Sequence, residues 1–342
     1  MNPKRSQLQR GFSLVELMIG IALGLVIMAS LTSFFVKSSE NRREIDRAGR
    51  QIENGRFALD TIRNDVHLGG FYAELSTAGV TWQAPDPCDP AVANMGFNVL
   101  PLKIPVPVFG YADGAAMPAC VTDRMAGTDV LVLRRLNTET TPVASASNNN
   151  TPYLQLSRCA TDSSSTPWVF GVGSAPGAFI VKNTNCSAVG DLYRYRVELI
   201  YVRTWSAVVG DGIPTLVKVE VDWNVAPPLA APFTGLNVLP LVEGIENLRL
   251  EYGVDNTGDG APDEYRRCDA TTPCTADQWA NVTAVRAYVL ARNLESTMGY
   301  TDVKTYDLGS GNPRTVGPFN DAIKRHVYAA MVTMPNRAGP RE

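Results

Sequence analysis

One carboxylate lies inside an otherwise apolar stretch near the start of this 342-residue chain. The stretch runs from Phe12 to Val36, and Glu16 is its only charged residue. An ionised side chain costs roughly 2.5–3.5 kcal/mol at the centre of a bilayer on insertion scales, and less near the end of a span. Because a carboxylate kept at that cost is expected to pair with a cation, Glu16 is the first residue for which we expect a functional role.

Side chains for catalysis are scarce in the rest of the sequence. Its two histidines, His67 and His326, are far apart, and we find no P-loop, HExxH or paired-carboxylate pattern. The segment GVGSAPG at 171–177 matches neither the GxSxG elbow nor the GxGxxG fingerprint. We therefore expect a protein that is not an enzyme.

The overall charge gives no reason to expect a nucleic-acid partner. The net charge is −3 and the isoelectric point about 5.6, so nothing in the balance favours nucleic acid or anionic lipid. Arg134, Arg135, Arg194 and Arg196 lie on predicted strands and are the exposed candidates for such binding. Alternating arginines on strands are more often a solvated face, so no nucleic-acid binding is expected.

The cysteines indicate an oxidising compartment. The six cysteines are Cys88, Cys120, Cys159, Cys186, Cys268 and Cys274. They form no CxxC pair and have no histidine at zinc-finger spacing, so disulfides are expected rather than a zinc site. Short separation favours Cys268 with Cys274, and sequence order favours Cys159 with Cys186 and Cys88 with Cys120. Reduced core cysteines are the alternative.

The apolar stretch is long enough to cross a membrane. Leu17 to Val36 is free of charge over twenty residues, which is about 30 Å of helix. The ten residues before Gly11 contain three basic residues and no acid, so the N-terminus is predicted to be cytoplasmic and the C-terminal bulk to lie outside. A secretory signal would have a shorter apolar region followed by a small-residue cleavage site, whereas Gly11 precedes the apolar run.

This N-terminal segment, GFSLVELMIGIAL, resembles the class III signal of type IV prepilins and pseudopilins. In that family the prepilin peptidase cuts after the glycine and methylates the new first residue. The resemblance implies cleavage between Gly11 and Phe12, which would make Glu16 the fifth residue of the mature chain.

The resemblance gives Glu16 a physical role. Cleavage would leave a charged amine on Phe12 inside the membrane, and a buried cation needs a partner. We expect Glu16 of an entering subunit to pair with the Phe12 amine of a neighbour already in the filament, which would set the axial register. The alternative is that Glu16 reaches to the interface and pairs with its own amine.

The helix is predicted to continue beyond the membrane. Residues 38–64 contain no proline, and apolar or small residues recur three and four positions apart. They are Ile45, Ala48, Ile52, Gly55, Leu59, Ile62 and Val66. A helix from Phe12 to about Val66 would be about 80 Å long, and LGGFY at 68–72 should end it. One face is expected to pack on the protein's own head and another on neighbouring helices.

The rest of the chain, 69–342, is predicted to be a β-rich head. Five runs have strand composition: 128–136, 193–205, 215–223, 246–254 and 282–291. Residues 80–190 are expected to be a loop-rich insertion, irregular and disulfide-tied over 80–125. The predicted fold class is α+β: a leader (1–11), then a long helix made of a transmembrane part (12–36) and an amphipathic part (37–68), packed on the head.

Several segments narrow the resemblance to the PilW family of type IV minor pilins. They are IENGRFALDTIRNDVHLGGFY, GTDVLVLRR, LVEGIENLRLEYGVD and VTAVRAYVLARN. The resemblance implies a protein of the bacterial inner membrane with a periplasmic head, which is later incorporated into the pilus. Its implied partners are the prepilin peptidase, other minor pilins, the major pilin and a large tip adhesin, in a complex that primes pilus assembly and supports twitching motility and adhesion. A J-type minor pseudopilin of type II secretion is the alternative, although those chains tend to be shorter.

One head segment, DNTGDGAPDEYR at 255–266, resembles the calcium loops of EF-hands and thrombospondin-type repeats. The resemblance implies oxygen ligands from Asp255, Thr257, Asp259, the Ala261 carbonyl and Asp263. Arg266 stands where a bidentate acid belongs, so Glu264 would have to bend in. The alternative is an acidic turn between two strands. If the loop binds calcium, a calcium-dependent surface adhesin becomes a further alternative function.

Overall fold

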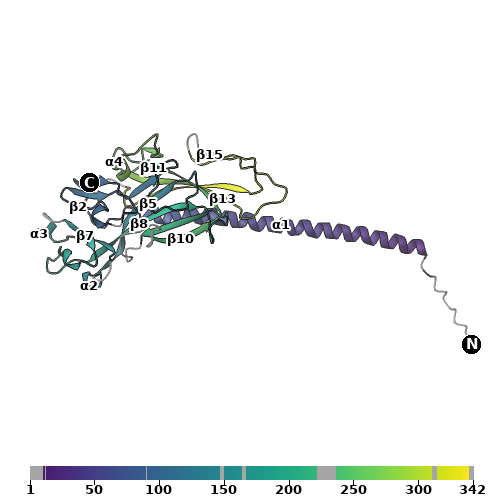
Figure 1. Cartoon of the computed structure of the whole chain (residues 1–342), viewed down its shortest axis with the longest axis horizontal. Coiled ribbons are helices and arrows are strands. Elements are labelled where there is room, and N and C mark those ends of the chain that lie inside the picture. The colour runs from purple at the N-terminus through teal and green to yellow at the C-terminus, as the bar shows by residue number, and fades with distance from the viewer. Residues whose placement is uncertain are drawn as a thin grey trace, which may run out of the picture. The chain divides into compact units, whose positions relative to one another are not determined.

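The computed structural model describes residues 11, 13–89, 91–146, 150–163, 167–221, 236–309 and 314–338. The chain forms two compact units, Met1–Arg50 and Gln51–Glu342. From Leu14 onward the first unit is helical, and the second is a β-rich head that also contains the last turns of that helix (Figure 1). The predicted fold class, a long apolar N-terminal helix and a β-rich head, is confirmed.

Helix α1 (Leu14–Leu68) is a single element of 55 residues, in agreement with the extent predicted from the sequence. It ends where Gly70 adopts a positive φ of 73°, a conformation that glycine takes at little cost and that commonly terminates helices. The Gly70 N–H then donates to the Arg134 carbonyl at 3.0 Å. The chain therefore leaves the helix by joining the main sheet.

Within the second unit, one face of α1 is buried. The buried helix residues are Gln51, Gly55, Ala58, Leu59, Ile62, Asp65 and Val66. Four of these belong to the predicted seam, but Ile45 and Ile52 of that seam are 70% and 45% exposed. The polar Gln51 is buried because its amide donates to the carbonyls of Ala291 and Lys324 at 3.0 and 2.8 Å, which satisfies it inside the protein.

The main sheet has seven antiparallel strands, with the path β10-β9-β8-β5-β4. They are β4 (Val108–Tyr111), β5 (Val130–Thr141), β6 (Pro152–Leu156), β7 (Trp168–Val172), β8 (Leu192–Arg203), β9 (Thr215–Val221) and β10 (Leu236–Glu243). Strand β8 pairs with β5 on one edge, and with β9 and β6 on the other. Strand β7 then pairs with β6.

The second sheet is antiparallel in the order β12-β11-β13-β16. Its strands are β11 (Ile245–Val254), β12 (Glu264–Arg266), β13 (Val282–Arg292) and β16 (Arg325–Thr333). Two small sheets join β1 (Thr81–Gln83) and β2 (Asn98–Val99) to β3 (Leu102–Pro105), and β14 (Tyr306–Asp307) to β15 (Thr315–Val316). The short helices are α2 (Val143–Ala146), α3 (Ala160–Ser163), α4 (Ala276–Ala280), η1 (Val92–Asn94) and η2 (Pro176–Ala178).

Apolar residues cover both faces of the main sheet. On β5, Leu131 and Leu133 enter a core shared with α1 and the second sheet, whereas Val130 and Val132 enter a core beneath residues 71–121. The sequence of a strand that is buried on both faces is a continuous apolar run, without alternation of apolar and polar residues. This arrangement explains the sequence DVLVL in an antiparallel strand.

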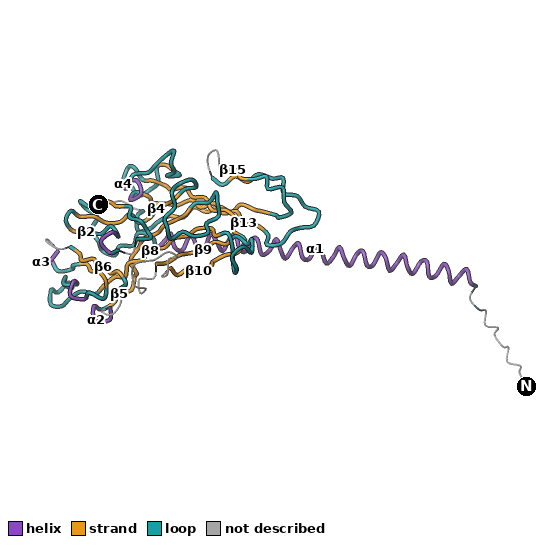
Figure 2. The backbone as a smooth tube through the Cα atoms, in the orientation of Figure 1, coloured by secondary structure: helices purple, strands orange, loops and turns teal. Residues whose placement is uncertain are grey.

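The five strands predicted from the sequence are confirmed as β5, β8, β9, β11 and β13, with the end of the 215–223 run lying outside the described residues. The region 80–190 is more regular than expected, because it contains β1 to β7. Most of these strands have two to five residues, too few for a clear alternation. Strands occupy the middle of the head and loops its ends (Figure 2), with α3 and β7 at one end and β15 toward the other.

Candidate functional site

The candidate processing and assembly residues predicted from the sequence lie at or just before the start of α1. Gly11 is exposed, Phe12 lies outside the described residues, and the helix begins at Leu14. The Ser13 backbone N–H donates to Oε2 of Glu16 at 3.1 Å. This is the reciprocal arm of a capping box, in which a Glu three residues after the N-cap satisfies the N-cap N–H. Glu16 is therefore held at the positive end of the helix dipole, where an anion is favoured.

The first part of α1 has the length and composition of a membrane span. Its mean hydropathy reaches 2.4 over an 18-residue window, none of which is buried within the protein. Large apolar side chains from Leu14 to Val36 are between 48% and 75% exposed. Such a surface needs an apolar environment, either lipid or other helices.

In its last turns, α1 is tied to the main sheet by an ion pair. Asp65 of α1 accepts from Lys218 of β9 at 3.2 Å, with only 10% and 17% of the two side chains exposed. Nearby on the sheet, Arg135 donates to Glu198 at 3.0 Å, and Arg196 contacts Glu198 and Glu220. Burial raises the pKa of the Glu198 carboxyl, which Arg135 partly offsets.

These contacts correct the prediction of exposed arginines. Arg134 is 1% exposed and donates to the Pro85 carbonyl, and Arg135 is 9% exposed. Arg194 and Arg196 are partly buried. The sequence could not show this burial because Glu198 lies 63 residues from Arg135 along the chain.

The candidate calcium loop follows β11. Asp255 is buried, and its carboxylate accepts the N–H groups of Thr257, Gly258 and Gly260 at 3.1, 2.6 and 2.9 Å. Asp263 accepts from the Thr257 N–H at 3.0 Å and from its hydroxyl at 3.2 Å. The hydroxyl is also 3.4 Å from the Asp255 carboxylate. The loop thus brings together three of the predicted ligand groups, those of Asp255, Thr257 and Asp263.

Two other predicted ligands, Asp259 and Glu264, have separate partners. Asp259 accepts the N–H of Ala261 at 2.8 Å, and Glu264 pairs with Arg266 at 2.9 Å and with Asn256 at 3.0 Å. Within the described part of the chain, no group of three or more His, Cys, Asp or Glu is arranged to hold a metal ion.

All six cysteines are paired as proximity and sequence order predicted. The bonds are Cys88–Cys120, Cys159–Cys186 and Cys268–Cys274. Each closes a local loop of the head, with sequence separations of 32, 27 and 6. The first links the parts of the 80–125 region, and the last lies just after the acidic loop.

Two family models match parts of this chain. Residues 7–32 match the prokaryotic N-terminal methylation motif, and residues 201–336 match the PilW family, type IV pilus-assembly protein W. Among solved structures, a type IV-like pilin from Thermus thermophilus is similar at 12% identity and a TM-score of 0.35, over 84% of this chain and 97% of that one. No curated protein matches the chain.

The match to the methylation motif, together with a long apolar N-terminal helix followed by a β-rich head, makes the chain similar to type IV pilin-like proteins. The region from the end of β8 to just past β16 matches the PilW family. The family resemblance drawn from the sequence is confirmed.

Proposed function

We propose that this protein is a minor pilin that joins other minor pilins, the major pilin and a large tip adhesin in a complex that primes pilus assembly. The prepilin peptidase would cut it between Gly11 and Phe12 and methylate Phe12. The mature chain would sit in the inner membrane with its head in the periplasm, where the three disulfides can form and persist. From there it would enter the pilus tip and support twitching motility and adhesion.

The observation that carries the proposal is the geometry of Glu16 at the start of an exposed apolar helix. Its Oε2 accepts the Ser13 N–H, and among the described residues no donor contacts Oε1, so a second donor could bind there. A protonated amine on a neighbour's Phe12 would supply that donor. In an apolar surrounding, such a pair is far stronger than at a protein surface, because the low dielectric strengthens the Coulomb attraction.

The pairing also accounts for the priming step. Nucleating a helical polymer costs entropy before many contacts exist, and preformed contacts among minor pilins offset that cost. In the first unit, these contacts would come from the exposed apolar surface of residues 14–36 and from one charge pair per neighbour that fixes the register.

A deletion strain tests this function. One culture is scored for sheared surface pili, for twitching and for secreted exoproteins. Lost pili and twitching with normal secretion are expected. Lost secretion with intact pili would instead identify a minor pseudopilin of type II secretion, and normal results in both would leave the surface adhesin.

A second proposal concerns the acidic loop. We propose that Asp255, Thr257 and Asp263 form the starting point of a weak calcium site, because their side-chain oxygens already converge around the Thr257 hydroxyl. Calcium prefers six to eight oxygen ligands, so Asp259, the Ala261 carbonyl or water would have to complete the set. Calcium titration of the full chain tests this site.

A further inference from the structure

The head carries a small polar pocket, which is lined by residues from the segment 140–193. This region lies outside both segments that match known families, so neither family match accounts for it. The pocket has a volume of about 170 Å³. Drug-sized ligands usually occupy roughly 300–1,000 Å³, so this pocket has room for a single small ring.

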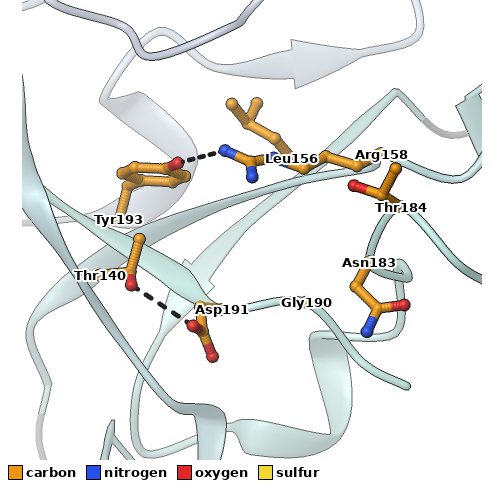
Figure 3. Close-up of a pocket in the computed structure, with 8 residues that line it drawn as sticks. All are labelled: Thr140, Leu156, Arg158, Asn183, Thr184, Gly190, Asp191 and Tyr193. Carbon is orange, nitrogen blue, oxygen red and sulfur yellow. Dashed lines mark hydrogen bonds between the residues drawn. The ribbon is translucent and has the colours of Figure 1, made fainter. Parts of the chain in front are cut away.

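Four separate segments supply its walls (Figure 3). Thr140 comes from β5, Tyr193 from β8, Leu156 from the end of β6, and Asn183 from the loop between η2 and β8, inside the segment closed by Cys159–Cys186. Thr140 and Tyr193 are direct neighbours in the sheet, because the register pairs them. Strand pairing therefore fixes one wall, and the loop forms the facing one.

The loop that carries Asn183 is itself held in place. The disulfide Cys159–Cys186 ties it to the segment after β6. Gln155, which is fully buried, donates to the Gly190 carbonyl at 2.6 Å and accepts the Val181 N–H at 3.1 Å, so that it joins both ends of the loop. A wall fixed by a covalent bond and buried hydrogen bonds loses little entropy when a ligand binds.

Two charged side chains face the pocket, and they differ in how far their hydrogen-bonding groups are already occupied. Arg158 donates to the Tyr193 hydroxyl at 2.7 Å and pairs with Glu74 at 3.0 Å, so its charge is balanced and its guanidinium is fixed. Asp191 accepts only from the Thr140 hydroxyl, at 3.3 Å, among the residues that the structure describes. Most of its acceptor capacity is open, because a carboxylate has about four lone-pair sites.

We propose that this pocket binds one neutral sugar ring, either free or at the end of a glycan. Asp191 would accept two adjacent sugar hydroxyls, Asn183 would donate and accept through its amide, and Leu156 with the Tyr193 ring would contact the C–H face. A pocket ringed by hydroxyl, amide and carboxylate groups around a small apolar surface suits a polyol. An anionic ligand would meet the open Asp191 carboxylate, and a cationic one would meet the Arg158 guanidinium.

The test uses the full chain in amine-oxide detergent micelles, because glycoside detergents would present sugar heads to the pocket. Saturation-transfer NMR is recorded with the methyl glycosides of glucose, galactose, mannose and N-acetylglucosamine, and with the free sugars. The variant is Asp191→Ala. The matched control is Asp307→Ala, another exposed aspartate, on β14 and away from the pocket.

We expect at least one of these sugars to bind with a Kd on the order of 1 mM. Asp191→Ala should weaken that binding at least about tenfold, since it removes the charged acceptor, and Asp307→Ala should leave it unchanged. Tighter binding of a methyl glycoside than of its free sugar would identify a glycan end as the ligand.

Three outcomes would overturn the proposal: no saturation transfer to any of the sugars, equal binding by Asp191→Ala, or a preference for ethylammonium over every sugar. Because binding is measured on the isolated chain, the result is independent of the deletion phenotype that tests the function.

Discussion

Helix α1 approaches the second sheet closely at Gly55. A Cβ added there would collide with the Tyr328 ring of β16, with the ring Cγ only 2.9 Å away. Tyr328 cannot easily swing aside, because its ring packs edge-on against His326 at 4.8 Å and its strand is paired to β13. Gly55→Ala should therefore overpack this contact.

Two opposing effects set the magnitude. Replacing Gly by Ala inside a helix stabilises it by about 1 kcal/mol, whereas overpacking a core contact costs about 1–3 kcal/mol. With ring atoms this close we expect a cost at the upper end, and hence a net loss of about 2 kcal/mol. In a Tyr328→Ala background, where the ring is gone, the same Gly55→Ala change should stabilise by about 1 kcal/mol. The coupling between the two positions is then about 3 kcal/mol.

Urea unfolding of the full chain in micelles, followed by tryptophan fluorescence, measures all four members of this cycle. Gly49→Ala is the matched control, since a Cβ at that helix position meets nothing within 4 Å, and it should raise the free energy of unfolding by up to about 1 kcal/mol. A Gly55→Ala protein as stable as the wild type, or one equally destabilised with and without Tyr328, would refute the packing argument.

Four further predictions follow from the same contacts. Glu16→Gln keeps an acceptor for the Ser13 N–H but loses the charge, so it should be processed and membrane-inserted normally yet recovered poorly with partner pilins; wild-type co-isolation would contradict the charge pair. Lys218→Ala removes the partner of the largely buried Asp65 carboxylate of α1, so it should lower the free energy of unfolding by about 2 kcal/mol. An unchanged urea midpoint would contradict this expectation. Partial burial would raise the pKa of Asp269, but hydrogen bonds from Thr271 and Thr272 outweigh it and lower the pKa to about 2. Because the pKa in the folded protein lies below the ordinary value of 3.8, this stabilisation is present above about pH 4 and lost toward pH 2. Asp269→Asn should flatten that part of the melting-temperature profile, and parallel profiles would count against it. Calcium titration should give heat with a Kd of roughly 0.1–1 mM, reduced by Asp263→Asn, and neither heat nor a higher melting temperature would remove the site.

Features encoded by local patterns could be predicted from the sequence. The extent of α1 follows from an unbroken apolar run and a proline-free continuation, and LGGFY supplies the stop at Gly70. The five predicted strands have enough residues to show their composition. Disulfide pairing also followed from proximity, because each bond closes a local loop.

Features that depend on partners distant in sequence could not be predicted. Nothing in the sequence near Arg135 indicates that it pairs with Glu198, a carboxylate on β8. Gln51 enters the core because two carbonyls near the C-terminal end of the head accept its amide hydrogens. The polar pocket is assembled from four segments. In the sequence, each of them has the composition of an ordinary loop or strand end and gives no sign of a binding site. For such sites the sequence gives the side chains, and only the fold gives their proximity.

Mass spectrometry of the sheared pilus fraction tests the central claim most directly. Trypsin should release the mature N-terminal peptide of this chain, from Phe12 to Lys37, with the Phe12 amine methylated. We predict that this peptide is present in purified pili at a low ratio to the major pilin. If the peptide is absent from the pili, or if the chain there still carries the residues before Phe12, then the protein is not a processed minor pilin and the account is wrong.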